Sequence, residues 1–370
     1  NRRGTCGWIT SFNDYTHSLF FYFVTDFSIS LHSYLSCRID MSTISVIMPV
    51  YNVESYLPIT LNSILQQTVQ DITLICINDG STDSSLSILE EYARRDTRVV
   101  IFNQENKGAS AARNKGLEHV QTPYVAFIDS DDIVHPQYLE ILLDAIKEYD
   151  VDFVWCKDKR FYKDSEIEHE RTLHYTEYNK SVFSPIFKHF VLRLEPHPSV
   201  MMNKLYKSSL LHSIRFNESL RHVEDILFAH YMLYQATEAV FVDLQLYYYR
   251  QRGESVSNVG FSPKYIEDHI TVGEELAKYF SAVPMDEETQ EHFWFRTAKM
   301  MLKNPLVQPW RKRRKEAKEY WHLYGERLRR LYKEKLFRPE YLDMRNKILA
   351  YALLNEKYWL IRCILKLSYW

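Results

Sequence analysis

Three carboxylates crowd together in the segment Asp129-Ser130-Asp131-Asp132, which directly follows the hydrophobic run YVAFI at 124–128. Closely spaced negative charges repel one another and favour the binding of a cation. Mg²⁺ or Mn²⁺ binds through one or two carboxylates together with substrate phosphates, and a D-x-D sequence at the end of a strand can supply that arrangement. The same residues could instead form an acidic turn that caps the next helix. Taken alone, the segment leaves both interpretations open.

A second acidic pair, Glu224 and Asp225, precedes the apolar run at 226–228. Carboxylates are favoured at a helix N-terminus, so the pair can be a simple helix start. A carboxylate beside a bound substrate can also serve as a general base. Lys107 and Arg113 lie near the start of another predicted helix, where backbone N–H groups and basic side chains suit a diphosphate. Surface charge on a helix is the alternative for these two residues.

From residue 44 onwards, apolar runs typical of strands alternate with amphipathic segments typical of helices. These elements must position the residues named above. Such alternation predicts an α/β protein with a doubly wound, mostly parallel sheet flanked by helices. Ligands bind at the carboxyl ends of the strands in such sheets, and this rule selects 51–54, Asp79 and 129–132. The predicted strands cover 44–50, 72–78, 99–103, 124–128 and 151–156, and the predicted helices cover about 54–67, 83–95, 109–120 and 136–149.

Several ordered segments together resemble the family 2 glycosyltransferases, which have the nucleotide-diphosphosugar transferase (GT-A) fold. The resemblance covers about residues 44–252 and becomes weak beyond 260. It implies a cytoplasmic, metal-dependent transfer of a sugar from a UDP-sugar to an acceptor hydroxyl. The segments are SVIMPVYNVESYL (45–57), ICINDGSTDSS (75–85), NQENKGASAARNKGL (103–117), YVAFIDSDD (124–132), NKLYK (203–207) and VEDILF (223–228).

The resemblance also implies roles for individual residues. Asp79 lies where the family places a carboxylate that accepts a hydrogen bond from uracil N3–H, although it can also be a turn residue before Gly80. Asp129 would contact the ribose or the metal, and Asp131 would be the principal metal ligand, with Mn²⁺ or Mg²⁺ as the cofactor. The other residues expected to bind the donor are Val50, Tyr51, Glu54, Lys107, Arg113, Ser130, Lys204 and Arg250.

The resemblance assigns catalysis to Asp225 and Glu224, with the aspartate as the base that removes the acceptor proton. One base suffices for a single displacement, which inverts the anomeric centre. Bacterial enzymes that build capsule, exopolysaccharide or lipopolysaccharide are the most similar in length and motifs, so we expect a carbohydrate or lipid-linked acceptor. The alternatives are an inactive nucleotide-sugar-binding module and a sugar-phosphate nucleotidyltransferase. A dinucleotide-dependent oxidoreductase is disfavoured because PVYNVE (49–54) lacks the G-x-G-x-x-G turn.

The chain has 370 residues, and we expect three parts in it. Residues 1–40 lack helical or strand periodicity and precede Met41, so we interpret them as a leader or an upstream-translated segment outside the fold. Residues 41–260 form the predicted catalytic domain, with the nucleotide-sugar half at about 41–132 and the acceptor half at 133–260. Residues 261–370 form a predicted helical, basic and aromatic C-terminal region.

Composition narrows the class of protein further. A formal net charge of −2 argues against a protein that coats nucleic acid. The positive charge is concentrated at 311–338, a segment that contains 12 Lys and Arg residues but only 4 Glu residues. This segment can bind to the anionic inner face of the cytoplasmic membrane, or it can be a solvated helix pair. The five cysteines have no metal-ligand spacing, which indicates reduced thiols in the cytoplasm.

Overall fold

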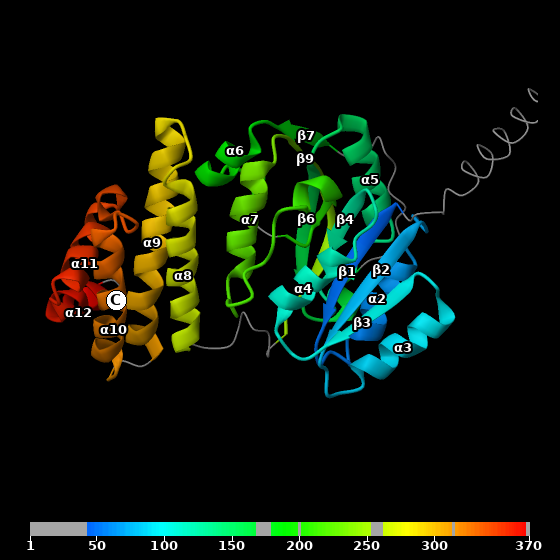
Figure 1. The fold of residues 1–370 in the computed structure, drawn as a ribbon, viewed down its shortest axis with the longest axis horizontal. Helices are drawn as coiled ribbons and strands as arrows, with labels where there is room; N and C mark the ends of the chain where they lie inside the picture. The colour runs from blue at the N-terminus through cyan, green and yellow to red at the C-terminus, as the bar shows by residue number, and fades with distance from the viewer. Residues whose placement is uncertain (1–42, 168–178, 199–200, 253–261, 313–314, 368–370) are drawn as a thin grey trace, which may run out of the picture. The chain divides into compact units, whose positions relative to one another are not determined.

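The computed structural model describes residues 43–167, 179–198, 201–252, 262–312 and 315–367. All of them belong to one compact unit, Thr43–Trp370. The predicted leader at 1–40 lies outside the described residues, and Figure 1 shows the element order. No helix within the described ranges combines enough length and apolar character to cross a membrane.

A mixed sheet forms the centre of the unit. Its strand order is β3-β2-β1-β4-β8-β6-β9-β5, and β7 pairs with β9. The four strands β1 to β4 are parallel, as the alternating pattern predicts. β8 is inserted antiparallel between β4 and β6, and β5 and β7 are antiparallel to β9. The strands are β1 (Ile44–Val50), β2 (Ile72–Asp79), β3 (Val99–Gln104), β4 (Tyr124–Phe127), β5 (Ile133–Val134), β6 (Phe153–Phe161), β7 (Lys180–Phe183), β8 (Lys204–Lys207) and β9 (Ala239–Arg250).

Helices cover both faces of the sheet, and alternation along the strands explains why. In β1 the side chains of Val46 and Met48 join one core, whereas Ile47 joins the core on the opposite face. The first core packs against α2 (Leu57–Leu65), α3 (Ser85–Arg95) and α5 (Tyr138–Tyr149). The opposite face is covered by α4 (Ala109–Glu118), α6 (Ile186–Leu192) and α7 (Glu224–Gln235).

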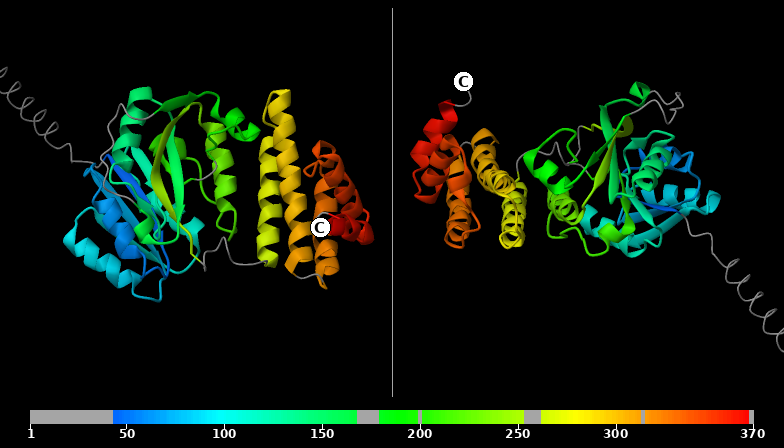
Figure 2. Two further views of the ribbon diagram at one scale, coloured as in Figure 1. Left: turned by 180° about the vertical axis from the view of Figure 1, so that it is seen from behind. Right: turned by 90° about the horizontal axis from the view of Figure 1, so that it is seen from above.

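The C-terminal helices share a core with the catalytic part of the chain. A single hydrophobic cluster runs from Phe127 in the sheet through Phe228 and Ile270 to Trp321 and Leu353. Figure 2 shows the first of the C-terminal helices, α8, beside α7, with the others beyond it. The predicted helical region is thereby confirmed, and it packs as part of the main unit. Its helices are α8 (Pro263–Phe280), α9 (Glu287–Lys312), α10 (Ala317–Lys333), α11 (Met344–Leu354) and α12 (Tyr358–Leu367).

Candidate active site

The candidate site lies where β2 and β4 end and where α4 and α7 begin. Asp79 is the last residue of β2, and the acidic segment at 129–132 follows β4. Gly108 precedes α4, and Glu224 is the first residue of α7. Parallel strands present their carboxyl ends at one edge of the sheet. The fold therefore gathers residues that are more than a hundred positions apart in the sequence, such as Arg113 and Glu224.

Arg113 joins the acidic segment after β4 to the acidic pair at the start of α7. Its Nη2 donates to Asp129 Oδ1 at 2.9 Å, and its Nη1 donates to Glu224 Oε1 at 3.0 Å. Only 5% of Arg113 is exposed. Burial opposes its positive charge, but the two carboxylates outweigh that effect and raise its pKa. Arg113 therefore positions two carboxylates, and its contact with a diphosphate stays a prediction.

Residues at the end of β9 hold the other two carboxylates of the acidic segment. Asp131 Oδ2 pairs with Arg252 Nε at 2.6 Å. Asp132 is fully buried and accepts hydrogen bonds from the Tyr247 hydroxyl at 2.7 Å and from Arg250 N at 2.8 Å. Burial and the neighbouring carboxylates raise the pKa of both aspartates. The site therefore penalises their negative charge, which a bound cation would relieve.

Asp225 has the properties of a general base. Burial raises its pKa to about 6, Glu224 adds to the rise, and Arg113 opposes it. The carboxylate is then ionised at neutral pH and is a stronger base than an ordinary aspartate. Val223, the residue before the pair, has φ 57°, a left-handed conformation that is unfavourable for a β-branched side chain. Strained backbone of this kind is concentrated at functional sites.

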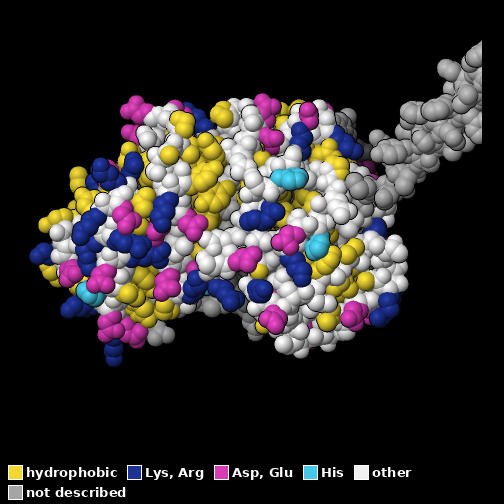
Figure 3. All heavy atoms as spheres, viewed as in Figure 1, with side chains coloured by type: hydrophobic (Ala, Val, Ile, Leu, Met, Phe, Trp, Pro, Cys, Tyr) yellow, Lys and Arg dark blue, Asp and Glu magenta, His cyan; other side chains and the backbone are white. Residues whose placement is uncertain are grey.

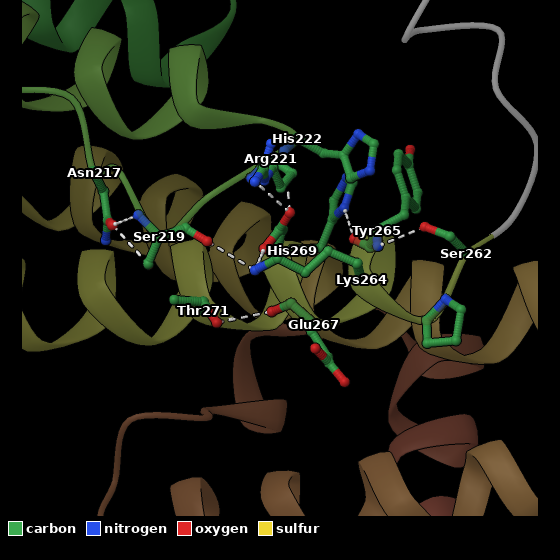
Figure 4. A network of polar contacts seen from close by, with 12 residues as sticks. Asn217, Ser219, Arg221, His222, Ser262, Lys264, Tyr265, Glu267, His269 and Thr271 are labelled. Atoms are coloured by element: carbon green, nitrogen blue, oxygen red, sulfur yellow. Dashed lines mark hydrogen bonds and ion pairs between the residues drawn. The ribbon is translucent and has the colours of Figure 1, made fainter. Parts of the chain in front are cut away.

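The segment that leads into the acidic pair is fastened to α8, as Figure 4 shows. Asp268 is fully buried, and its Oδ2 accepts hydrogen bonds from the backbone N–H groups of Arg221 and His222, both at 3.0 Å. Lys264 Nζ contacts Asp268 Oδ1 at 2.6 Å and donates to the carbonyl of Ser219 at 2.8 Å. The C-terminal helical region therefore helps to position the candidate base.

The loops after β1 and β2 are tied together on the side predicted to hold the nucleoside. Glu54 N donates to Asp83 Oδ2 at 3.0 Å, and Glu54 Oε2 accepts from Ser84 N at 2.8 Å. Glu54 thus fixes the loop. Tyr51 is 47% exposed and can stack on a base, whereas the Val50 side chain is fully buried.

Asp79 is almost fully buried and fastens the loop before α4. Its carboxylate accepts hydrogen bonds from Gln104 Nε2 at 2.7 Å and from the N–H groups of Lys107 and Gly108, both at 2.8 Å. Gly108 has φ 93°, which favours glycine at this bend. An ionised carboxylate has about four acceptor positions, so these bonds leave one for a ligand. The contact of Lys107 within this loop is made by its backbone.

Three other predicted donor-binding residues are buried among protein groups. Lys204 lies on β8 inside the sheet, has no exposed surface, and donates to Asn203 Oδ1 at 3.0 Å; burial lowers its pKa to about 7. Arg250 is 5% exposed, and its Nε donates to the carbonyl of Asp131 at 2.6 Å. Ser130 is also 5% exposed. The Lys204 side chain is fully buried, so the structure does not bring it to an accessible surface.

The donor atoms for a divalent cation are carboxylate oxygens, the type that Mg²⁺ and Mn²⁺ prefer. Arg113 contacts one oxygen of Asp129, and Arg252 contacts one oxygen of Asp131, so each carboxylate keeps a second oxygen for a cation. Within the described part of the chain, no group of three His, Cys, Asp or Glu residues converges on one metal position. The residues therefore fit a metal that substrate phosphates help to hold.

Comparison with known proteins identifies the family. The model of the family described as glycosyl transferase family 2 matches residues 45–214. The glycosyltransferase GlyG of Streptococcus pneumoniae is 31% identical over 250 residues, which cover 62% of this chain and 77% of GlyG. The chain belongs to glycosyl transferase family 2. The uncharacterized glycosyltransferase EpsJ of Bacillus subtilis is 31% identical over 238 residues, covering 61% of this chain and 66% of EpsJ.

A solved structure of similar fold supports the GT-A architecture of this family 2 chain. It is S. aureus TarS 1-349 in complex with UDP-GlcNAc, with a TM-score of 0.69, 19% sequence identity, and coverage of 88% of this chain and 90% of TarS 1-349. At this identity the likeness concerns the fold alone. The alignment with EpsJ spans slightly less than two thirds of EpsJ.

Sequence reasoning missed three residues of this family 2 site, namely Arg252, Asp268 and Tyr247. Arg252 lies two residues after Arg250, at the end of the segment that resembles the family, so its position alone could have indicated it. Tyr247 is one of three consecutive tyrosines, and no pattern separates it from its neighbours. Asp268 lies on a helix far beyond the motifs, and its role depends on a tertiary contact.

Proposed function

We propose that this family 2 chain transfers a sugar from a UDP-sugar to an acceptor hydroxyl with inversion of the anomeric centre. The observation that carries the proposal is the Arg113 bridge. One terminal nitrogen of the Arg113 guanidinium contacts Asp129, which belongs to the candidate metal and donor segment. The other terminal nitrogen contacts Glu224, which lies next to the candidate base. A donor held at the first carboxylate thus has its anomeric carbon near the second acidic pair, as proximity catalysis requires.

The donor side of the proposal rests on the acidic segment and on the loops after β1 and β2. Asp131 and Asp129 would hold Mn²⁺ or Mg²⁺, which neutralises charge on the departing diphosphate. Arg252, already beside Asp131, can turn to the diphosphate once a metal neutralises that carboxylate. Tyr51 would stack on uracil, and the remaining acceptor position of Asp79 would receive uracil N3–H. The TarS structure of the same fold contains UDP-GlcNAc, which supports a UDP-sugar as the donor class.

In the proposed reaction Asp225 removes the proton from the acceptor hydroxyl. The hydroxyl oxygen forms a bond to the anomeric carbon while the bond from that carbon to the diphosphate oxygen breaks. Attack from the face opposite the diphosphate inverts the anomeric centre in this single step. Glu224 remains paired with Arg113, raises the basicity of Asp225 and does not itself need to accept a proton. The released products are UDP and the glycosylated acceptor.

We also propose that the acceptor belongs to a bacterial cell-surface polysaccharide or lipopolysaccharide. One relative, GgaB of Bacillus subtilis, is described as a minor teichoic acid biosynthesis protein, which supports this class of acceptor. A cytoplasmic protein that contacts the inner face of an anionic membrane through 311–338 would meet lipid-linked acceptors. Lys and Arg side chains are frequent over the C-terminal helices in Figure 3, but acidic side chains accompany them.

Several arginines of this basic segment are used inside the protein. Arg327 and Arg330 pair with Glu274 of α8, and Arg338 lies 3.8 Å from the ring centroid of Trp294. These contacts support the alternative of a packed helix pair for that part of the segment. Membrane contact would therefore depend on the exposed lysines Lys315, Lys318, Lys333 and Lys335.

The test is a UDP-release assay with a panel of UDP-sugars and glycan acceptors. The wild-type protein should release UDP in the presence of an acceptor, and NMR of the product should show the anomeric configuration opposite to that of the donor. The Asp225→Asn variant should lose at least about a hundredfold in kcat, in the range typical for removal of a general base. Retention of configuration would exclude the single displacement, and binding of UDP-sugar without turnover would favour the inactive binding module.

A further inference from the structure

A cavity lies between the catalytic part of the chain and the C-terminal helices, against the helix α7 that begins with the candidate base pair. It has a volume of about 970 Å³ and is lined by residues from the end of α6, from α7 and α8, and from α9. Ile226 and His230 of α7 form part of its wall. Asp225 directly precedes Ile226 on α7, so the candidate base and one wall residue of this cavity lie in the same helical turn.

The wall of this cavity is positively charged. Arg193, Arg296, Lys299 and Lys303 line it, together with two acidic residues, Glu291 and Glu340. In the part of the chain that the structure describes, none of the four basic residues forms a salt bridge. Elsewhere in the molecule, arginines such as Arg113 and Arg327 are paired with carboxylates. An excess of positive charge in a concave, partly apolar site attracts anions.

Arg296 is a partly buried member of the four basic residues and contacts the end of α6. Its Nη1 donates to the carbonyls of Phe190 and Val191, at 3.0 and 3.2 Å, and its guanidinium lies 5.2 Å from the Phe190 ring centroid. These bonds cap the end of α6 and explain part of its burial. Burial, followed by the nearby charge of Arg193, lowers the pKa of Arg296 to about 10. The capping bonds explain why Arg296 lies here, but they do not explain why the cation Arg193 lies near it.

Arg193 is held in an unusual backbone conformation beside Arg296. It follows α6 with φ 56°, the left-handed region where glycine is the favoured residue. Three histidines also line the wall, namely His230, His269 and His292. Burial lowers the pKa of His230 to about 3, and burial also lowers the pKa of His269. The lining thus carries two arginines and two lysines against two glutamates.

We infer that this cavity binds an anionic group of the acceptor, a phosphate ester on a glycan, while the reacting hydroxyl of the same molecule lies at Asp225. The inference rests on the proposed function, because it names the chemistry of the acceptor for that site. Ile226 and His230 lie one and five residues after Asp225, which at 1.5 Å per residue is about 2 to 8 Å along α7. Arginine and lysine are the side chains that bind phosphate esters by charge-assisted hydrogen bonds.

The test uses a full-length double variant, Arg193→Gly and Lys303→Gln. Both side chains are exposed, glycine suits the left-handed φ at 193, and glutamine is a good helix former, so the variant should fold. The matched control is Arg94→Gln with Lys147→Gln, which removes two exposed basic side chains of α3 and α5. The probe is a short glycerol phosphate oligomer, titrated by calorimetry in the presence of UDP and Mn²⁺ so that the donor site is filled.

We expect the oligomer to bind the wild-type protein and the control equally, and to bind the double variant about tenfold more weakly. Equal binding to all three proteins, or no binding to the wild type, would overturn the inference. In a parallel arm, vesicles of anionic phospholipid replace the oligomer. If the double variant loses vesicle binding but not oligomer binding, the ligand is a lipid headgroup and the assignment to the acceptor is wrong.

The same preparations separate this inference from the proposed function. UDP binding without oligomer binding would leave the donor site intact and remove only the anionic acceptor. Oligomer binding that depends on Arg193 and Lys303, without any UDP binding, would leave the cavity as an anion site and remove the UDP-sugar proposal. With an active acceptor, the double variant should raise the acceptor KM about tenfold while acceptor-independent hydrolysis of the UDP-sugar stays unchanged.

Discussion

Arg113 connects two carboxylates, Asp129 and Glu224, that the sequence places 16 and 111 residues away from it. The sequence predicted the residue types of the site and their positions at strand and helix ends, because those follow from local patterns. It could not predict which charges pair, since pairing depends on how distant segments meet. For the same reason the sequence could not show that the Lys204 side chain, predicted to bind the donor, is fully buried.

At the residue scale, the Arg113→Lys variant tests the bridge. A lysine has a single ammonium group and cannot reproduce the two-sided fork, so one of the two partly buried carboxylates loses its partner. We expect a loss of about 3 kcal/mol in the free energy of unfolding, in the range for breaking a buried ion pair. Chemical denaturation at pH 7 measures this loss. An unchanged free energy of unfolding would mean that the Arg113 bridge does not stabilise the folded protein.

The raised pKa of Asp225 predicts a pH dependence for both activity and stability. Activity needs the ionised carboxylate, so kcat/KM should rise as pH increases through about 6 and level off above 7. Because burial raises the pKa in the folded state, ionisation of Asp225 lowers stability as pH rises through that value. Asp225→Asn should therefore raise the free energy of unfolding at pH 8 by about 1 to 3 kcal/mol and change it much less at pH 4. Denaturant titrations of both proteins at the two pH values check this, and equal differences at both pH values would contradict it.

At the element scale, α8 belongs functionally with the catalytic part of the chain. Local periodicity predicted the strands β1 to β4 and the helices between them, because each is a simple strand–helix unit. It did not predict the antiparallel insertion of β8, which follows a long connection after β6 that shows no clear periodicity in the sequence. Nor did it indicate that α8 holds the segment before the base, because Asp268 makes that contact across 46 and 47 residues.

Removing the Asp268 carboxylate tests the role of α8. In Asp268→Ala the N–H groups of Arg221 and His222 lose their acceptor, so the segment before Val223 should become mobile. We expect kcat to fall about tenfold or more while the affinity for UDP stays within about twofold, because the donor loops are untouched. The control is Glu267→Ala, an exposed residue of the same helix. Similar losses in both variants, or a matching loss of UDP affinity, would contradict a role in positioning the base.

At the scale of the whole molecule, the C-terminal helices and the sheet share one hydrophobic cluster. The sequence predicted helices there but gave no sign that they continue the main core, since that core includes residues as distant in sequence as Phe127 and Trp321. The basic segment at 311–338 is accordingly both a packing element and the candidate membrane contact. Changes in surface lysines separate these roles better than a truncation, which would open the core.

A full-length variant with Lys315, Lys318, Lys333 and Lys335 changed to Gln tests membrane contact. Each Lys near an anionic membrane contributes about 1 kcal/mol, so the variant should lose more than a hundredfold in partitioning onto anionic vesicles. Its thermal unfolding should change little, because these side chains are exposed. Co-sedimentation with vesicles measures the effect, and a partition coefficient equal to that of the wild type would support the solvated helix pair.

The proposed function depends most directly on the binding of metal-bound UDP by the acidic segment 129–132 after β4. The most direct measurement is a calorimetric titration of the protein with UDP, with and without Mn²⁺, on the wild type, on Asp131→Ala and on the control Glu267→Ala. We predict binding by the wild type and the control that strengthens at least about tenfold with Mn²⁺, and loss of that strengthening in Asp131→Ala. UDP binding that is the same in all three proteins, or that is absent from the wild type, would contradict the account.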